Sequence, residues 1–518
     1  MWGIFENMRV IDPSPATGAG EKRLYWFAVV LALASCLPVA VAHYPQMSDY
    51  PAHLARYAVM LDGGRSADLA AYYSFHWAWT GNLGVDILIR PFAAIFGLET
   101  GGRIIAGIIP PLTALGLIAV DRQLHGRVTI ASLLAMPFAW SPMMLIGLLN
   151  YALGQALALW AFALWVWLDR SGKSGTRAVW WLRSALFVPI ALVVWLSHLS
   201  AWGVLGVLIF GYEIGAAKSF GRSRWWAFVT PWPLLAPLVV MVLVPGTAGT
   251  FSYGPYWWIY KQAIWLKAMR DTVYALDYMS LVAVALAFLA AAAFRRLDGR
   301  LGWAAFILLL MTIAVPRHIS GGDYADYRLV TTGLMICCLA IRWPRAPGWV
   351  LTPVVMLYLT RLLITTQDWY GDSARMEKMM VALDHVPQGA RVASAVLVTR
   401  EQWPLNHFEH IGAYAVVRRH ALVNANFAVP HVHMLQLKQG GRDFDDPSQR
   451  LLLHRWQKLD LANFAPARQA DWLWYVGERE PDTMPEGAQI VWRGQGSLLA
   501  RLKTAPQPAP LAKSGKRD

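Results

Sequence analysis

Long apolar runs fill residues 24–366, and they restrict this chain more than any other feature of its sequence. A helix that crosses the hydrocarbon core of a membrane needs about 20 mostly apolar residues. Charged residues make up only 15% of the chain, whereas soluble proteins carry about 25%, so a soluble fold is not expected. The sequence predicts an α-helical polytopic membrane protein with about eleven transmembrane helices, at 24–43, 104–120, 128–147, 151–168, 183–198, 201–217, 226–245, 278–294, 301–315, 328–341 and 349–366.

Lysine and arginine gather in every second loop between these runs, at 1–23, 121–127, 169–182, 218–225, 295–300 and 342–348. The short loops of the opposite set hold only Lys261, Lys267, Arg270 and Arg317. Because cytoplasmic loops are rich in Lys and Arg, the N-terminal segment 1–23 is expected in the cytoplasm, and an odd number of spans places the C-terminal domain outside. The same flanking charges account for much of the net charge of +14, so no nucleic-acid partner is expected.

The part of the chain after the last apolar run has the composition of a soluble protein. Residues 367–504 are predicted to form a small C-terminal α/β extracytoplasmic domain, with an amphipathic helix at Ser373–His385. Strands are expected at 392–398, 415–417, 421–423, 472–476, 490–492 and 498–502. Residues 505–518 are expected to be a disordered tail. The histidines of the domain do not have the spacing of a tight zinc motif (His407, His410, His431 and His433).

The long first outer loop, residues 44–103, carries the first polar residues of interest. Asp49, His53 and Arg56 lie three or four residues apart and would share one side of a helix that begins near Pro51. The alternative is that Asp49 only caps this helix. Asp86 follows later in an interfacial or re-entrant helix at 83–98, where it could simply pair with Arg90, four residues on.

Three further outer segments carry polar residues that are costly at membrane depth. Asn150 lies at a short turn and could merely cap the next helix, and His198 lies at the tip of the next hairpin, where a structural role is the alternative. The third segment, 316–329, contains Arg317, His318, Asp323, Asp326 and Arg328. Arginine forks suit phosphate recognition, although these acids and arginines could also pair with each other. Five separated segments therefore bring polar side chains to the outer side of the membrane.

These motifs and their order resemble the GT-C superfamily of polytopic glycosyltransferases, which use polyprenyl-phosphate-linked sugars. The resemblance lies in Asp49-Tyr50-Pro51-Ala52-His53-Leu54-Ala55-Arg56 after the first span, the long outer loop, Asn150-Tyr151-x-Leu153-Gly154, Ser197-His198 and Arg328 in a late outer loop. It covers about residues 24–370, and the tail agrees with it by architecture only. The chain departs from the family in one respect, because many members have an acidic pair where Asp49 stands between Ser48 and Tyr50.

The resemblance implies a membrane enzyme of the inverting type, in a bacterial inner membrane, with a periplasmic C-terminal domain. Asp49 would be the catalytic residue of the first loop, acting on the acceptor as a general base or as a metal-linked acid, and Asp86 is a weaker candidate for a second acid later in that loop. Arg328 and Arg317 would hold the phosphate of a polyprenyl-phosphate sugar donor. The acceptor would be an envelope glycan, lipid or protein. The resemblance fixes no cofactor and leaves open whether a divalent metal, Mg or Mn, is held by Asp49.

Two other classes of protein fit parts of the sequence. A polytopic transporter or lipid flippase would also have many spans, but such proteins usually bind substrate near the middle of the membrane and contain inverted repeats. No internal repeat is evident in this sequence, and its polar segments favour one surface. A non-catalytic envelope protein whose tail binds a partner is the third hypothesis.

Overall fold

The computed structural model of the whole chain describes residues 18–170, 177–217, 221–243, 250–319, 322–343, 345–428 and 433–502. The predicted disordered tail 505–518, His431 and most of segment 1–23 lie outside these residues. The chain divides into two compact units. Unit 1 comprises Met1–Met47, Trp77–Ser373 and Trp403–Leu405, and unit 2 comprises Ser48–His76, Ala374–Gln402 and Asn406–Asp518.

Unit 1 is helical, apart from one pair of short strands, β2 (Phe251–Ser252) and β3 (His318–Ile319). Its helices are α2 (Ala19–Ala34), α3 (Leu37–Val41), α6 (Gly84–Phe96), α7 (Leu98–His125), α8 (Ile130–Ala135), η1 (Met136–Trp140), α9 (Pro142–Ile146), α10 (Leu149–Arg170), α11 (Arg177–Ser197), α12 (Leu199–Ala217), α13 (Trp226–Val229), η2 (Trp232–Leu235), α14 (Ala236–Leu243), α15 (Trp257–Leu266), α16 (Tyr274–Ala293), α17 (Gly299–Ala314), α18 (Ala325–Leu339) and α19 (Gly348–Met380). The division between the units falls within α19.

Within the described residues, seven helices are long and apolar enough to cross a membrane. They begin at Leu98, Leu149, Val179, Leu199, Trp226, Tyr274 and Gly348, and each coincides with a predicted span. The chain is therefore a membrane protein with several apolar helices. The helix break at His198 separates α11 from α12, as the length of the apolar run at 184–217 requires.

The other predicted spans are shorter or interrupted helices in the structure. The run at 24–43 is divided into α2 and α3, with Pro38 in the first turn of α3. The run at 128–147 is divided into α8, η1 and α9, with Pro137 and Pro142 at the beginnings of the last two pieces. Proline cannot donate a backbone hydrogen bond and fits best in a first helical turn, which explains these interruptions.

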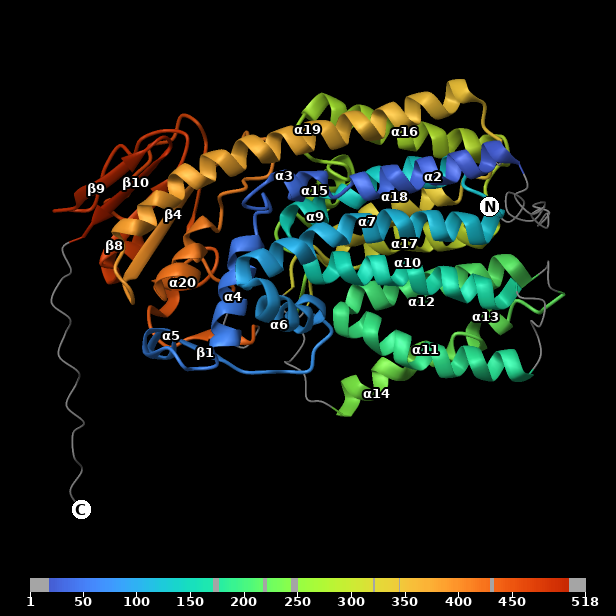
Figure 1. Cartoon of the computed structure of the whole chain (residues 1–518), viewed down its shortest axis with the longest axis horizontal. Helices are drawn as coiled ribbons and strands as arrows, with labels where there is room; N and C mark the ends of the chain where they lie inside the picture. Colours follow the sequence, from blue (N-terminus) through green and yellow to red (C-terminus); the bar gives the residue numbers. More distant parts are fainter. Residues whose placement is uncertain are drawn as a thin grey trace, which may run out of the picture. The chain divides into compact units, whose positions relative to one another are not determined.

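The core of unit 1 is built from helices that run alongside one another, including α7, α10, α12 and α17 (Figure 1). Small residues allow the closest approach. A Cβ atom built on Gly211 of α12 would lie 2.6 Å from the backbone nitrogen of Ala304 in α17. Such small-residue contacts are common between membrane helices. Because lipid tails are as apolar as the side chains, burial from lipid gains little, and close van der Waals packing stabilises the helix pair instead.

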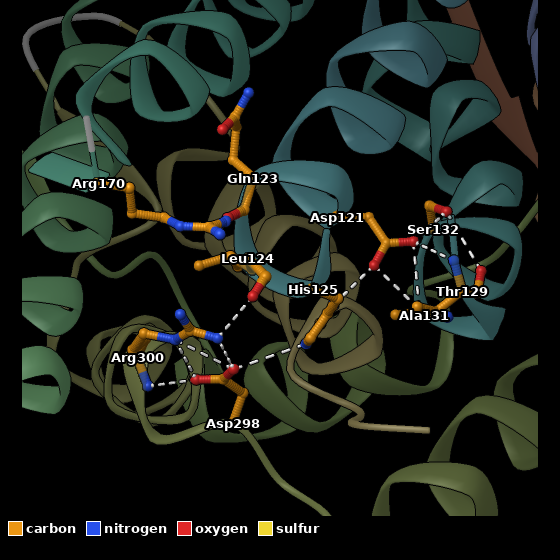
Figure 2. Close-up of polar contacts among 10 residues, drawn as sticks. All are labelled: Asp121, Gln123, Leu124, His125, Thr129, Ala131, Ser132, Arg170, Asp298 and Arg300. Carbon is orange, nitrogen blue, oxygen red and sulfur yellow. Dashed lines mark hydrogen bonds and ion pairs between the residues drawn. The ribbon is translucent and has the colours of Figure 1, made fainter. Parts of the chain in front are cut away.

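At the C-terminal end of α7 lies a buried polar network that the sequence analysis overlooked (Figure 2). The Asp121 carboxylate accepts hydrogen bonds from the backbone N–H of Thr129 (2.7 Å) and from Ser132 Oγ (2.6 Å), and lies 2.7 Å from His125 Nδ1. His125 Nε2 is 3.5 Å from Asp298, which also accepts from Arg300 Nε at 2.9 Å. The network ties α7 to the N-terminal end of α17, and its charges are paired.

A second paired cluster lies at the C-terminal end of α10. Asp169 accepts from Tyr212 Oη and from Arg222 Nη2, both at 3.0 Å. Arg183 lies 3.5 Å from both Asp169 and Glu213. Helix α10 has 22 residues and is about 33 Å long, so these groups lie a membrane thickness away from Asn150 at its other end. Buried ionisable residues thus occupy both ends of the helices, and the expectation that they favour the outer side was incomplete.

Unit 2 contains a mixed six-stranded sheet. Its strands are β4 (Arg391–Thr399), β5 (Leu422–Val423), β7 (Arg450–Leu453), β8 (Trp472–Val476), β9 (Gln489–Gly494) and β10 (Ser497–Arg501). The order is β5-β4-β8-β10-β9, and β7 pairs with the C-terminal half of β4. β4 is parallel to β5, β7 and β8, whereas β10 is antiparallel to β8 and β9. Five of the six predicted strands are present in this sheet.

Unit 2 also contains α4 (Tyr50–Asp62), α5 (Ala67–Tyr72), η3 (Val381–His385), η4 (Ile411–Ala413), α20 (Tyr414–Arg419), η5 (Gly441–Phe444), η6 (Ala465–Gln469) and a two-stranded sheet of β1 (Tyr73–Phe75) and β6 (Leu435–Leu437). The strand predicted at 415–417 was wrong, because this segment lies in α20. Its small and β-branched residues suit a strand locally, but packing against η4 and α4 favours a short helix.

Part of the first outer loop folds with the C-terminal segment. β1 pairs antiparallel with β6, and Tyr73 Oη donates to the carbonyl of Ala421 at 3.0 Å. The backbone N–H of Val423 donates to the same hydroxyl at 3.0 Å. Residues 48–76 are therefore an integral piece of unit 2, although more than 300 residues separate them from its sheet.

The contact between α12 and α17 provides a test of the packing of unit 1. Gly211→Ala is expected to destabilise the protein by about 1–3 kcal/mol, because the new methyl group meets the backbone of Ala304 and the helices must move apart. Gly206→Ala in the same helix is the matched control, since no atom lies within 4 Å of its Cβ position. Thermal unfolding of the purified protein in detergent measures both, and equal midpoints for the two variants would contradict the packing.

Candidate functional site

Asp49 immediately precedes helix α4 in unit 2, and its carboxylate is not used to cap that helix. Its backbone is already helical, with φ −92° and ψ −12°, and its side chain accepts no capping hydrogen bond. Pro51 lies in the first turn of the helix, where its fixed φ favours helix initiation without a polar cap. The alternative that Asp49 serves only as a helix cap therefore does not fit the geometry.

The Asp49 carboxylate lies among charged groups from the C-terminal part of unit 2. Its nearest partner is His410, whose Nδ1 is 3.8 Å from Oδ1 of Asp49. Burial raises the pKa of Asp49 to about 7, and the positive charge of His410 opposes this rise. The side chain is 19% exposed, so the carboxylate can still be reached. A carboxylate that titrates near neutral pH can accept a proton from a substrate hydroxyl and release it again.

His410 is held from both sides of its ring. Nδ1 lies 3.0 Å from the carbonyl oxygen of Ser48, and Nε2 lies 3.1 Å from Oδ1 of Asp446. These two partners can only accept, which favours a proton on each ring nitrogen, while the amide nitrogen of Gln449 also lies 3.0 Å from Nε2. Burial lowers the pKa of His410, but Asp446 and Asp49 outweigh it and raise the pKa to about 9. His410 is therefore an imidazolium at neutral pH.

His53 and Arg56 follow Asp49 along α4 and lie near aromatic rings. The His53 ring is 5.1 Å from the ring of Phe427 and stacks on Tyr57 at 6.1 Å. Phe427 also lies 5.0 Å from the ring of His410. The guanidinium of Arg56, which is buried, is 5.3 Å from the Tyr57 ring. The structure thus brings Asp49 and His53 to the same group of side chains, around His410 and Phe427.

The surroundings of Asp49 do not favour a metal site. A metal ligand must offer a lone pair, and both ring nitrogens of His410 donate hydrogen bonds to other groups. The carboxylate of Asp446 is occupied by His410 and by Gln449, which donates at 3.1 Å. These residues therefore fit an imidazolium and its two carboxylates better than Mg or Mn.

Asp86 and Asn150 are brought together in unit 1. Asn150 Nδ2 donates to Oδ2 of Asp86 at 3.0 Å and to the carbonyl of Asn82 at 2.8 Å. Its Oδ1 accepts from the backbone N–H of Val85 at 2.6 Å. Asn150 therefore fastens the N-terminus of α6 to the N-terminus of α10, instead of capping its own helix. Arg90 lies over the ring of Trp77, 4.6 Å from its centre.

Tyr151, His198 and Arg328 form a second group in unit 1, next along α10. The Tyr151 ring meets the His198 ring edge to face at 5.3 Å, and the Arg328 guanidinium lies 5.5 Å from the Tyr151 ring. Nδ1 of His198 accepts from the backbone N–H of Ser200 at 3.0 Å. Because Nδ1 accepts this hydrogen bond it carries no proton, and His198 is therefore neutral.

Arg328 is buried, yet in the described part of the chain no carboxylate pairs with it and its Nε makes no hydrogen bond. An isolated buried charge is costly, which distinguishes Arg328 from the other cations of its loop. Arg317 forms a two-pronged ion pair with Asp323, with both hydrogen bonds at 2.8 Å. Asp326 pairs with Lys261 at 2.6 Å, and His318 lies 3.3 Å from Asp323.

The predicted site residues thus fall into three groups. Asp49, His53 and Arg56 belong to unit 2, whereas the other eight belong to unit 1. A second group lies at the N-terminal ends of helices in unit 1: Asp86 in α6, Asn150 in α10, His198 before α12 and Arg328 in α18. The third group is the loop with Arg317, His318, Asp323 and Asp326, whose side chains pair with each other or with Lys261. This pairing matches the alternative given for that loop. The sequence analysis missed His410, Asp446, Tyr151 and Lys261, because their partners are distant in sequence.

Three comparisons place the chain beside known proteins. No family profile matches the chain, and no curated protein sequence matches it. Among solved structures it is similar to the arabinofuranosyltransferase AftD from mycobacteria, with 15% identity, a TM-score of 0.45 and coverage of 96% of this chain but only 40% of AftD. It is also similar to ArnT from Cupriavidus metallidurans bound to undecaprenyl phosphate, with 11% identity, a TM-score of 0.49 and coverage of 95% and 100% of the two chains. These structural neighbours are GT-C glycosyltransferases.

The raised pKa of Asp49 predicts a dependence of stability on pH. The unfolded carboxyl ionises near pH 4 and the folded one near pH 7, so the folded state loses stability as the pH rises between these values. Asn cannot ionise, and Asp49→Asn is therefore expected to be more stable than the wild type at pH 8, by at most about 4 kcal/mol. The gain should shrink as the pH falls towards 4.

Thermal unfolding in detergent between pH 5 and pH 8 measures this difference. Asp384→Asn is the matched control in unit 2, because Asp384 is exposed and pairs with Arg419 at the surface. No pH-dependent gain is expected for the control. Equal stability of Asp49→Asn and the wild type at pH 8 would show that the carboxylate is not strained by burial.

Proposed function

We propose that this chain is an inverting membrane glycosyltransferase that transfers a sugar from a polyprenyl-phosphate-linked donor to an envelope acceptor. The observation that carries the proposal is the Asp49 carboxylate, which is reachable, caps no helix and titrates near neutral pH. Native proteins rarely keep such a carboxylate, because pairing or capping would stabilise them. A general base for a hydroxyl group is the chemistry that suits it best.

The reaction would proceed in one displacement. The acceptor hydroxyl oxygen forms a bond to the anomeric carbon of the sugar while the bond from that carbon to the phosphate oxygen breaks. The polyprenyl phosphate leaves with the electron pair, and the hydroxyl proton moves to Asp49. Proton transfer of this kind contributes about 10²–10⁴-fold to a rate. The configuration at the anomeric carbon is inverted, because attack and departure take place on opposite faces.

Arg328 is the residue we assign to the phosphate of the donor. A buried guanidinium without a carboxylate partner is stabilised when a phosphate oxygen approaches it. Tyr151 lies beneath it and would keep the guanidinium plane in place. His198, being neutral, adds no repulsion toward Arg328 and no competing charge. Arg317 is a weaker candidate, because Asp323 already neutralises it.

The orientation in the membrane follows from the positive charges and from the position of the proposed site. In this proposal the interrupted or shorter helices α2–α3, α8–α9, α17 and α18 join the seven long apolar ones as spans, which gives about eleven. The N-terminus is then cytoplasmic and unit 2 periplasmic, in a bacterial inner membrane. The paired networks at Asp121 and Asp169 would lie on the cytoplasmic side, and Asn150 on the side of the donor phosphate.

Loss of the general base is the direct test of the proposed reaction. Asp49→Asn is expected to lower product formation by at least about 100-fold without loss of folded protein. The measurement compares envelope glycolipids and glycans, by mass spectrometry, in a strain that lacks the gene and in strains that carry the wild-type, Asp49→Asn or Asp384→Asn form. The control Asp384→Asn should restore the wild-type glycans. Glycans restored equally well by Asp49→Asn would refute the enzyme.

Binding of undecaprenyl phosphate tests the donor site without knowledge of the sugar. Arg328→Gln is expected to weaken binding about 10- to 100-fold, because a hydrogen-bonded charge is worth about 1.5–3 kcal/mol. Arg317→Gln is the matched variant from the same loop, and its affinity should stay within about threefold of the wild type, since Asp323 already holds that arginine. Native mass spectrometry or a fluorescence titration in detergent gives the affinities. A larger loss for Arg317→Gln would reverse the assignment.

A further inference from the structure

We propose that His410 is a positioning residue for Asp49: a buried imidazolium that fixes the backbone before α4 and keeps the Asp49 carboxylate ionised before it accepts the proton of the acceptor hydroxyl. The inference rests on the proposed function, since it concerns the same carboxylate. His410 is 361 positions further along the chain than Asp49, and both belong to unit 2. It would act through Asp49 and would not touch the substrate.

The backbone evidence lies at Ser48. The carbonyl oxygen of Ser48 accepts from Nδ1 of His410 at 3.0 Å, and Ser48 Oγ donates to the carbonyl oxygen of Asn406 at 2.9 Å. Two points of the 406–410 segment therefore hold the residue directly before Asp49. Because the carbonyl of Ser48 belongs to the same peptide unit as the nitrogen of Asp49, fixing it restricts the direction in which the Asp49 side chain leaves the backbone.

The opposite side of the imidazolium is fixed by Asp446. Nε2 of His410 lies 3.1 Å from Oδ1 of Asp446, which also accepts from Gln449 Nε2 at 3.1 Å. His410 in turn lowers the pKa of Asp446, although burial alone would raise it. Asp446 thus keeps His410 charged and oriented. The contact between Nδ1 of His410 and Oδ1 of Asp49 is longer, 3.8 Å, so the charge of His410 stabilises the ionised carboxylate without a hydrogen bond to it.

The other charges near Asp49 do not replace His410. Glu409 and Asp446 are negative and raise the pKa of Asp49, whereas Arg450 lowers it. Glu409 and Arg450 form an ion pair with each other, with Nε 2.6 Å from the carboxylate, so their effects on Asp49 largely cancel. Three further basic side chains lie next to aromatic rings, His53 and His433 at Phe427 and Arg56 at Tyr57. The charge of His410 has the largest stabilising effect on ionised Asp49.

The test measures the ionisation of Asp49 directly. A water-soluble carbodiimide with glycine methyl ester labels protonated carboxyl groups, and mass spectrometry of the peptide that contains Asp49 gives the extent of labelling at each pH. The exposed Glu486 in the same sample serves as the internal reference. In the wild-type protein the labelling of Asp49 is expected to fall through about pH 7.

His410→Gln keeps a polar side chain of similar length but removes the charge. The labelling midpoint of Asp49 is expected to rise by at least about one pH unit, because the ionised carboxylate loses its nearest cation. His454→Gln is the matched control in unit 2, where His454 pairs with Glu401 at the surface, and its midpoint should equal that of the wild type. An unchanged midpoint in folded His410→Gln would overturn the proposal.

Asp446→Asn provides the second variant in case His410→Gln does not fold. It retains the imidazole but removes the carboxylate that keeps His410 charged. It also removes a negative charge that itself raises the pKa of Asp49, but the opposite effect of His410 is the larger of the two, so the midpoint of Asp49 is expected to rise by a smaller amount. A midpoint that stays the same or falls would count against the proposal. A role of His410 in packing alone predicts no rise of the midpoint.

Product formation separates this inference from the proposed function. The activity of His410→Gln should decline at neutral pH and recover in part at higher pH, whereas Asp49→Asn should stay inactive at every pH. Full activity of Asp49→Asn would refute the glycosyltransferase assignment itself. Inactive Asp49→Asn together with a wild-type pH profile for His410→Gln would refute only the role of His410.

Discussion

Charges that leave water must be compensated, and this constraint explains most of the polar structure of the protein. Asp121, His125, Asp298 and Arg300 are buried where α7 meets α17, and each has a partner of opposite charge or a hydrogen-bond donor. Removing one member would leave its partner buried and unpaired, which costs about 3–5 kcal/mol. Such networks hold helices in register. In such a structure an incompletely compensated charge is conspicuous, because pairing it would have stabilised the fold.

Two groups depart from this pattern. The Arg328 guanidinium lies over Tyr151 without a carboxylate in the described part of the chain, and Asp49 has a cation at 3.8 Å but no capping hydrogen bond. In the proposed reaction, Arg328 would be the cation for the departing phosphate and Asp49 the base for the entering hydroxyl. Their surroundings tune them in different ways, since an aromatic ring supports Arg328 whereas the imidazolium of His410 supports Asp49.

Prediction from sequence succeeded where the determining pattern was local. The apolar runs that became α7, α10, α12 and α16 are set by composition, because hydrocarbon accepts only helices without exposed backbone. The strands β4, β8 and β10 were recognised from continuous buried runs. The strand expected at 415–417 became α20, because the neighbours it packs against are not visible in its own residues. The ion pairs could not be predicted either, because nothing near Arg317 and Arg328 in the sequence indicates which of the two arginines Asp323 neutralises.

The sequence by itself determined that this chain lies in a membrane, where its helices run, and that Asp49, Asp86, Asn150, His198 and Arg328 are polar exceptions. Only the tertiary structure decided which groups these residues contact. It brought His410 beside Asp49, joined residues 48–76 to the C-terminal sheet, and bound Asn150 to Asp86. The reason is physical: hydrophobicity is a property of a residue and its near neighbours along the chain, whereas the state of a charge depends on distances to groups hundreds of residues away.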